Sequence, residues 1–262
     1  MSKLRHLCVY FTLIIASSAF GDLSKGNYYS KDLVEKLEQY SQEGTLKSHL
    51  FEVISEGQEV NFDYKRARQY LFGQIDIKQN SDGSYYFEDR YCDMRYGQES
   101  GVGPDQIPNS NVLNCEHTWP QSKFNPNLSK NTQKNDLHHL FGVWSNANSS
   151  RSNLIFAEVD GKVVSQKCIT SRRGYAKNSS QQIKAFEPPL NHRGNVARAL
   201  FYFSTRYQLP ISNEEEYYLR KWDKEDPVDQ EELSRNEKVF SIQKNRNPYI
   251  DDPDLVDLVK DF

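Results

Sequence analysis

The hydrophobic period of this sequence changes twice, and this change constrains the fold more than any other feature. Apolar residues recur at helical spacing near both ends, as at Leu33 and Leu37 and again at Val196, Leu200 and Phe203. Between these regions, short apolar runs are separated by turn residues, a pattern that indicates strands. Helices and strands therefore occupy separate parts of the chain, and no segment is repeated. We predict an α+β fold.

Capping and turn residues bound the expected elements. The expected helices run from Ser30 to Gly44, over 46–54, 62–71 and 194–207, and onward from Ser212, from Asp226 to about Lys244, and from Asp252. Gly73 is expected to stop the third of these helices. Two hairpins are expected, one pairing 75–78 with 84–91 and one pairing 155–159 with 162–164 around Asp160-Gly161.

The first 19 residues have the layout of a secretory signal. Lys3 and Arg5 precede an apolar run from Leu7 to Ala16, and small residues follow at 17–19. The run is shorter than the roughly 20 residues of a membrane-spanning helix. A buried N-terminal strand is the alternative. We therefore expect residues 20–262 to form a single secreted or periplasmic domain, without a membrane partner once the signal is removed.

Removal of this signal would leave three cysteines, Cys92, Cys115 and Cys168. An exported chain meets an oxidising compartment, so we expect one disulfide and one free thiol. Spacing alone does not choose the pair. We favour Cys92–Cys115, because it closes the smallest loop.

Charge is unevenly distributed along the chain. The full sequence carries a net charge of -3, which becomes −5 without residues 1–19 and excludes a globally basic nucleic-acid binder. However, residues 162–193 carry +6 and residues 214–232 carry −6. These stretches are either two unrelated solvated surfaces or one phosphate-binding face opposite an acidic one. The candidate nucleic-acid-binding residues are Lys162, Lys167, Arg172, Arg173 and Lys177.

Residues able to support hydrolysis concentrate between positions 115 and 153. Glu116 and Asn148 offer the oxygen ligands that Mg²⁺ prefers, and His117 is a suitable base for activating water. Neighbouring residues on a strand, such as Glu116 and His117, point to opposite faces of the sheet. Both can therefore serve one site only where the strand ends or bends, and Pro120 provides such an ending. The spacings of zinc fingers are absent. Taken singly, these residues could instead be a solvated carboxylate, a core histidine, and a helix cap or glycosylation acceptor.

This region contains three sequence motifs: Cys-Glu-His-Thr-Trp-Pro-Gln-Ser at 115–122, Asp-Leu-His-His-Leu-Phe at 136–141, and Ala-Asn-Ser-Ser-Arg-Ser-Asn at 147–153. In combination they resemble the secreted bacterial endonuclease I family of ββα-metal nucleases. The resemblance implies a ββα-metal core at about 113–155 and a helical part at about 193–262. It places Glu116 at the end of the first strand, residues 136–141 in the second, and Asn148 on the following helix.

The same resemblance implies a function. The chain would be a secreted, sequence-nonspecific endonuclease acting on DNA, with RNA as an open alternative, and leaving 5′-phosphate products. His117 would be the general base, and Glu116 and Asn148 would bind one Mg²⁺, with Mn²⁺ or Ca²⁺ as other candidate ions. Arg151 and Arg246 are candidates for an arginine that steadies the phosphate. We expect a monomer.

Two other classes of protein remain as alternatives. A non-catalytic extracellular DNA-binding or matrix protein could use the same fold, although intact Glu116, His117 and Asn148 argue against it. A secreted metallohydrolase could act on another substrate, although no His-Glu-x-x-His motif supports a peptidase.

Overall fold

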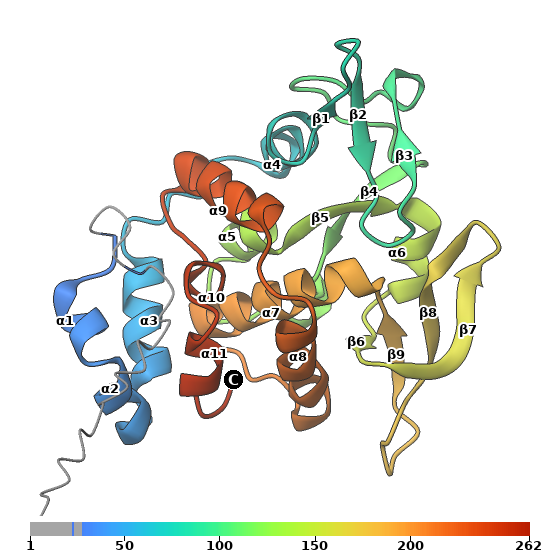
Figure 1. Ribbon diagram of the computed structural model, residues 1–262. Coiled ribbons are helices and arrows are strands. Elements are labelled where there is room, and N and C mark those ends of the chain that lie inside the picture. Colours follow the sequence, from blue (N-terminus) through green and yellow to red (C-terminus); the bar gives the residue numbers. More distant parts are fainter. Residues whose placement is uncertain (1–22, 24–27) are drawn as a thin grey trace, which may run out of the picture.

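The computed structural model describes Leu23 and residues 28–262, so the predicted signal at residues 1–19 lies outside the described part of the chain. Helices near both ends of the chain flank, in sequence, small and mostly antiparallel sheets, which confirms the predicted α+β class (Figure 1). Within the described residues, no helix combines the length and apolar character needed to cross a bilayer.

The N-terminal helical segment begins after Ser30 and ends at Gly44, as the capping residues predict. The helices in this part of the chain are α1 (Lys31–Glu35), α2 (Leu37–Glu43) and, after Gly44, α3 (Leu46–Ser55). Ser30 accepts a hydrogen bond from the Leu33 amide, and Gly44 ends α2 with a left-handed φ of 75°. The single helix expected here is divided at Lys36, whose backbone leaves the helical region.

Helix α4 (Tyr64–Tyr70) continues into a π-helical turn (Leu71–Ile75), so Gly73 does not stop it as predicted. Gly73 permits a close contact instead, because a Cβ there would lie 2.4 Å from the backbone nitrogen of Asp105.

The first expected hairpin is confirmed in shorter form. Its strands belong to a three-stranded sheet of β1 (Lys78–Gln79), β2 (Tyr85–Glu88) and β3 (Arg95–Tyr96).

A ββα unit lies at the centre of the chain. Strand β4 (Leu113–His117) pairs antiparallel with β5 (Leu140–Trp144), and α6 (Ser145–Arg151) follows directly. A short helix that the sequence analysis did not anticipate, α5 (Lys130–Asn135), lies in the connection between the strands. The second strand was expected at 136–141 but begins only at Leu140, because residues 137–139 form a 3₁₀ turn capped by Asp136.

The second sheet has four strands in the order β6 (Ile155–Phe156), β9 (Lys184–Glu187), β8 (Cys168–Ala176) and β7 (Val159–Ser165). The turn expected at Asp160-Gly161 is wrong, since β7 runs through it without a break. Gly161 lies directly opposite Gly174, and a Cβ on Gly161 would be 2.2 Å from the carbonyl oxygen of Arg173. This glycine therefore allows close strand pairing rather than a turn.

The C-terminal part is helical, with α7 (Arg193–Tyr207), α8 (Asn213–Glu225), α9 (Gln230–Gln243), α10 (Pro248–Asp251) and α11 (Leu255–Leu258). Helix α7 crosses the middle of the molecule, with α1–α3 toward one end and the sheet β6–β9 toward the other (Figure 1). Nearly all of its residues are buried, so it forms the centre of the core. Ser212 caps α8 as predicted, but α9 is capped by Asp229 rather than by Asp226.

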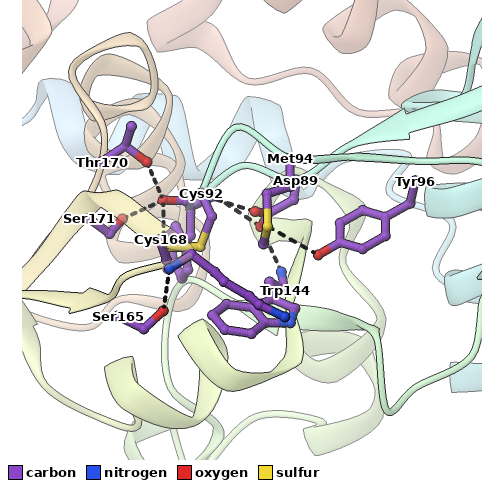
Figure 2. Close-up of a disulfide and its surroundings, with 11 residues drawn as sticks. Asp89, Cys92, Met94, Tyr96, Trp144, Ser165, Cys168, Thr170 and Ser171 are labelled. Carbon is purple, nitrogen blue, oxygen red and sulfur yellow. Dashed lines mark hydrogen bonds between the residues drawn. A yellow bond between two sulfur atoms is a disulfide. The ribbon is translucent and has the colours of Figure 1, made fainter.

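The disulfide joins Cys92 to Cys168, and Cys115 is a buried free thiol, so the predicted Cys92–Cys115 pair is wrong (Figure 2). Doubling a loop costs only about 0.6 kcal/mol of closure entropy, so loop size is a weak criterion. Packing decides the pair. Cys115 belongs to the hydrophobic cluster that contains Leu113 and Phe72, whereas Cys92 and Cys168 lie with their Cα atoms 4.7 Å apart.

Candidate active site

The ββα unit opens onto a pocket of about 310 Å³ beside the end of β4. The three residues predicted to carry the chemistry, Glu116, His117 and Asn148, all line it. Its other lining residues are Tyr64, Asn114, Cys115, Pro120, Gln121, Ser122, Arg151, Ser152 and Asn153. His117 is the last residue of β4, which lets both members of the Glu-His pair face one cavity.

Glu116 is 3% exposed, and one of its two oxygens is held firmly. Arg151 Nη1 donates to Oε1 at 2.7 Å, and the Tyr91 hydroxyl donates to the same oxygen at 3.0 Å. Burial raises the pKa of Glu116, and the Arg151 guanidinium opposes this rise. Both of these hydrogen bonds use Oε1, and we expect Oε2 to be the oxygen available to a cation in the pocket.

The hydrogen bonds of His117 define its tautomer. Its Nε2 lies 3.0 Å from the carbonyl oxygen of Lys134, which can only accept, so Nε2 carries the proton in the neutral ring. Nδ1 is then the unprotonated nitrogen, and the Gln121 amide donates to it over 3.3 Å. The imidazole thus presents a lone pair at Nδ1, as a general base requires.

Burial of the His117 ring, together with the nearby His139, lowers the pKa of His117 to about 3. The ring is therefore neutral at physiological pH. It can take up a proton from water without first having to lose one.

The donor set of the pocket fits a hard divalent cation. Glu116 supplies a carboxylate oxygen, and Asn148, half-buried on α6, supplies an amide oxygen. Across the described residues, no group of three or more His, Cys, Asp and Glu side chains could hold a metal ion. Two oxygen ligands are few for Ca²⁺ or Zn²⁺, but they suit Mg²⁺, which usually keeps several waters.

Tyr91 supports this site through its hydrogen bond to Glu116, and no sequence pattern predicted this role. Its carbonyl accepts hydrogen bonds from the hydroxyls of Thr170 (3.1 Å) and Ser171 (2.7 Å), and the next residue, Cys92, is tied to Cys168 (Figure 2). No sequence signal links residue 91 to Glu116, because the two meet only in the tertiary fold. By contrast, Gln121 belongs to the 115–122 motif and could have been identified there.

The two candidate arginines occupy different environments. Arg151 is 1% exposed and, besides Glu116, donates to the carbonyls of His117 and Thr118, so it holds the end of β4 in place. Arg246 is bound to Glu237 and Asp251 and does not line the pocket. Its assignment to the site is corrected, because these two carboxylates occupy its guanidinium.

Two other cations lie at the edge of the pocket. The Lys134 ammonium lies 4.3 Å and the Arg68 guanidinium carbon 4.9 Å from the ring centroid of Tyr64, which lines the pocket. Neither side chain forms an ion pair within the described part of the chain. Positive charge is therefore available next to Glu116 and His117.

The five predicted nucleic-acid-binding residues lie on or next to the β7–β8 hairpin, but they do not form one group. Lys162 and Arg173 line a second pocket together with Lys184. Arg172 donates a hydrogen bond to the Gly161 carbonyl, and Lys167 lies in the turn between the strands. Lys177 follows the end of β8, and none of these last three lines that second pocket.

Comparison with known proteins bears on this arrangement. The family model described as Endonuclease I matches residues 43–254. An extracellular ribonuclease of Bacillus subtilis (strain 168) is 31% identical over 55% of this chain and 52% of its own length. Endonuclease-1 of Buchnera aphidicola subsp. Acyrthosiphon pisum (strain APS) is 30% identical over 67% of this chain and 76% of its own.

An extracellular deoxyribonuclease of Aeromonas hydrophila is 30% identical over 46% of this chain and 50% of its own length. The chain therefore spans about half the length of two of these three relatives. The family match extends over the three-stranded sheet, the ββα unit, the four-stranded sheet and most of the C-terminal helices. On this evidence, the chain belongs to the endonuclease I family.

Proposed function

We propose that this protein is an exported, metal-dependent endonuclease that hydrolyses phosphodiester bonds in nucleic acid without sequence preference. One observation carries the proposal: a carboxylate, an amide oxygen and a neutral imidazole whose unprotonated Nδ1 accepts only from the Gln121 amide, among the described residues, line the same pocket. Relatives named as extracellular ribonuclease and extracellular or periplasmic deoxyribonuclease support the substrate class and the export.

In the reaction we propose, His117 Nδ1 removes a proton from a water molecule, and the water oxygen attacks phosphorus in line. The bond from phosphorus to the 3′ oxygen breaks, leaving a 5′-phosphate, and the 3′ oxygen takes a proton from solvent water to become a hydroxyl. His117 then returns its own proton to solvent, so the net reaction consumes one water molecule. A Mg²⁺ ion held by Glu116 and Asn148 would supply stabilisation of the charge on the phosphate and on the departing oxygen. Arg151 positions Glu116, and Lys134 and Arg68 supply positive charge at the pocket edge.

A cleavage assay tests this function. Plasmid DNA, single-stranded DNA and RNA are each incubated with the full protein in Mg²⁺ and in EDTA. We expect cleavage in Mg²⁺ alone, with 5′-phosphate ends. Retention of DNA without cleavage would support a non-catalytic binding protein instead, and cleavage undiminished by EDTA would remove the metal from the proposal.

Metal binding can be measured without relying on activity. Titration calorimetry with Mn²⁺ on the Glu116→Gln and Asn148→Ala variants is expected to show at least tenfold weaker binding than on the unmodified protein. Asn146→Ala is a matched control, because Asn146 is exposed on the same helix and does not line the pocket. Equal binding by Asn148→Ala and Asn146→Ala would rule out Asn148 as a ligand.

A further inference from the structure

The outer surface of strands β7–β9 carries three cations that lack an acidic partner. Lys162 and Arg173 lie opposite each other across β7 and β8, and Lys184 lies opposite Tyr175 across β8 and β9. Within the described residues, none of the three cations forms an ion pair or a side-chain hydrogen bond. Buried arginines such as Arg151, Arg198 and Arg235 are held by carboxylates, whereas these three cations keep their positive charge available at the surface.

These cations surround an exposed aromatic ring in a shallow pocket of about 440 Å³, here called the hairpin pocket. Its lining includes Lys162, Arg173, Tyr175, Lys184 and, from α6, Ser150. The Tyr175 side chain is 45% exposed, and in the described structure no other ring or cation packs on it. An aromatic face flanked by positive charge is the combination used by sites for single-stranded nucleic acid.

Acidic residues on the same sheet do not cancel this charge. Glu158 is bound to Lys221 and Arg193, and Glu187 is bound to Arg193. Asp160, opposite Tyr175 in the register, is the one carboxylate on this face, and it does not line the hairpin pocket. The pocket therefore keeps a net positive charge.

The hairpin pocket lies close to the candidate active site. Helix α6 contributes Asn148 to the active-site pocket and Ser150 to the hairpin pocket, so the two are separated by about one helix diameter, ~10–12 Å. A nucleic-acid strand advances about 3.4 Å per nucleotide in a duplex. A strand that reaches both pockets therefore spans a few nucleotides.

We propose that the hairpin pocket is a subsite for a single nucleic-acid strand, a few nucleotides from the bond that is cut. Backbone phosphates lie against Lys162, Arg173 and Lys184, and one unpaired base stacks on Tyr175. Its link to cleavage rests on the proposed function, but strand binding itself does not. A duplex fits less well, because its bases are already stacked and present no free face to Tyr175.

The tyrosine is tested by binding in EDTA, using the His117→Ala background so that no substrate is cut. Fluorescence anisotropy is measured with a 15-nucleotide thymidine oligomer, its uridine counterpart and a 15-base-pair duplex. Loss of one stacked base weakens binding by about tenfold. We expect this loss for Tyr175→Ala on both single strands and not on the duplex, with Tyr175→Phe within about twofold of the parent.

Tyr217→Ala is the matched control, because Tyr217 is 59% exposed on α8, away from the hairpin pocket. Equal weakening by Tyr175→Ala and Tyr217→Ala would overturn the subsite. So would a Tyr175→Ala effect that is the same on single strand and duplex, since base stacking could not explain it.

The cations are tested by salt dependence. Each phosphate contact on a single strand contributes about 0.7 to the slope of log affinity against log salt concentration. The double variant Lys162→Gln, Lys184→Gln is therefore expected to lower this slope by about 1.4. The double variant Lys31→Gln, Lys244→Gln, at exposed positions outside the pocket, is expected to leave it within about 0.3. Equal slopes for the two double variants would overturn the phosphate contacts.

These outcomes are separable from those for the proposed function. If the unmodified protein cuts no nucleic acid while Tyr175→Ala still weakens strand binding, the catalytic proposal fails and the subsite stands. If cleavage occurs but Tyr175→Ala changes neither binding nor KM for single strands, the subsite fails and the catalytic proposal stands.

Discussion

Two regions of this molecule contain the same kinds of residue, a buried carboxylate followed closely by histidine, yet they differ in what surrounds them. Asp136 is 0% exposed, and its two oxygens accept five hydrogen bonds. The donors are Gln58, Tyr202, Tyr207, Gln243 and the amide of His138. Glu116 accepts its two side-chain hydrogen bonds on one oxygen only, and it lines a pocket.

The histidines differ in the same way. His138 and His139 donate to the buried carbonyls of Asn245 and Gln133, and the remaining nitrogen of each ring is buried without a partner. The corresponding nitrogen of His117 meets the Gln121 amide within the active-site pocket. A cavity in front of the residues, rather than the residue types, thus separates the proposed catalytic pair from a structural one. The two regions should respond to mutation in opposite ways.

The largest effect is expected from His117→Ala on activity. Loss of a general base costs about 10²- to 10⁴-fold in kcat, and the loss of stability should be smaller than for Asp136, because the His117 side chain has two hydrogen-bond partners against five. Steady-state cleavage of a fluorescent oligonucleotide gives kcat, and urea denaturation gives the free energy of unfolding. A kcat within threefold of the parent protein would falsify the assignment of His117 as the base.

Asp136→Ala should do the reverse. Several buried donors would lose their acceptor, so we expect a loss of about 3 to 5 kcal/mol in the free energy of unfolding. Activity measured well below the melting temperature should fall less than tenfold, because Asp136 does not line the pocket. Asp63→Ala, which removes only an exposed cap of α4, is the control and should cost about 1 kcal/mol. A stability change no larger than that of the control would contradict the structural role.

The next largest effect is expected in the pH dependence of stability, which depends on the buried histidine His138. Burial lowers the pKa of His138 to about 4, although Asp136 opposes this. An unfolded histidine titrates near 6.5, so between pH 6.5 and 4 the unfolded state binds more protons, and stability falls as the pH falls. Urea denaturation in EDTA should show that the free energy of unfolding is lower at pH 4.5 than at pH 7.5, with roughly 1 to 3 kcal/mol of the difference due to His138. The variant His138→Gln should show a smaller pH-dependent loss, and an unchanged one would argue against His138 as the source.

The smallest effect is expected from Tyr91→Phe, which removes one hydrogen bond to Glu116 and leaves the ring in place. A hydrogen bond of this kind contributes about 1 kcal/mol, so kcat should fall about three- to tenfold while KM for the oligonucleotide stays constant. Tyr217→Phe, on the exposed face of α8, serves as the comparison. A change in KM alone would indicate that Tyr91 contacts substrate rather than positioning Glu116.

Local sequence patterns predicted much of the fold. The α+β class, helix α7, the cap at Ser30 and the end at Gly44 follow from short-range periodicity and backbone preferences. The predictions failed where a glycine had two possible uses. Gly73 and Gly161 were interpreted as breaks, but each allows another segment of backbone to approach closely. A glycine's sequence context does not distinguish these roles, because the approaching backbone comes from a distant position.

The sequence by itself identified Glu116, His117 and Asn148 as candidates, since ligand and base chemistry depends on residue type and the three lie in short motifs. Only the tertiary structure placed them around one pocket, paired Cys92 with Cys168, bound Arg246 to Glu237 and Asp251, and brought Tyr91 to Glu116. The physical reason is the separation along the chain over which each property is determined. Propensity, capping and chemical type are local properties, whereas disulfide geometry, burial and hydrogen-bond partnership depend on which distant segments pack together.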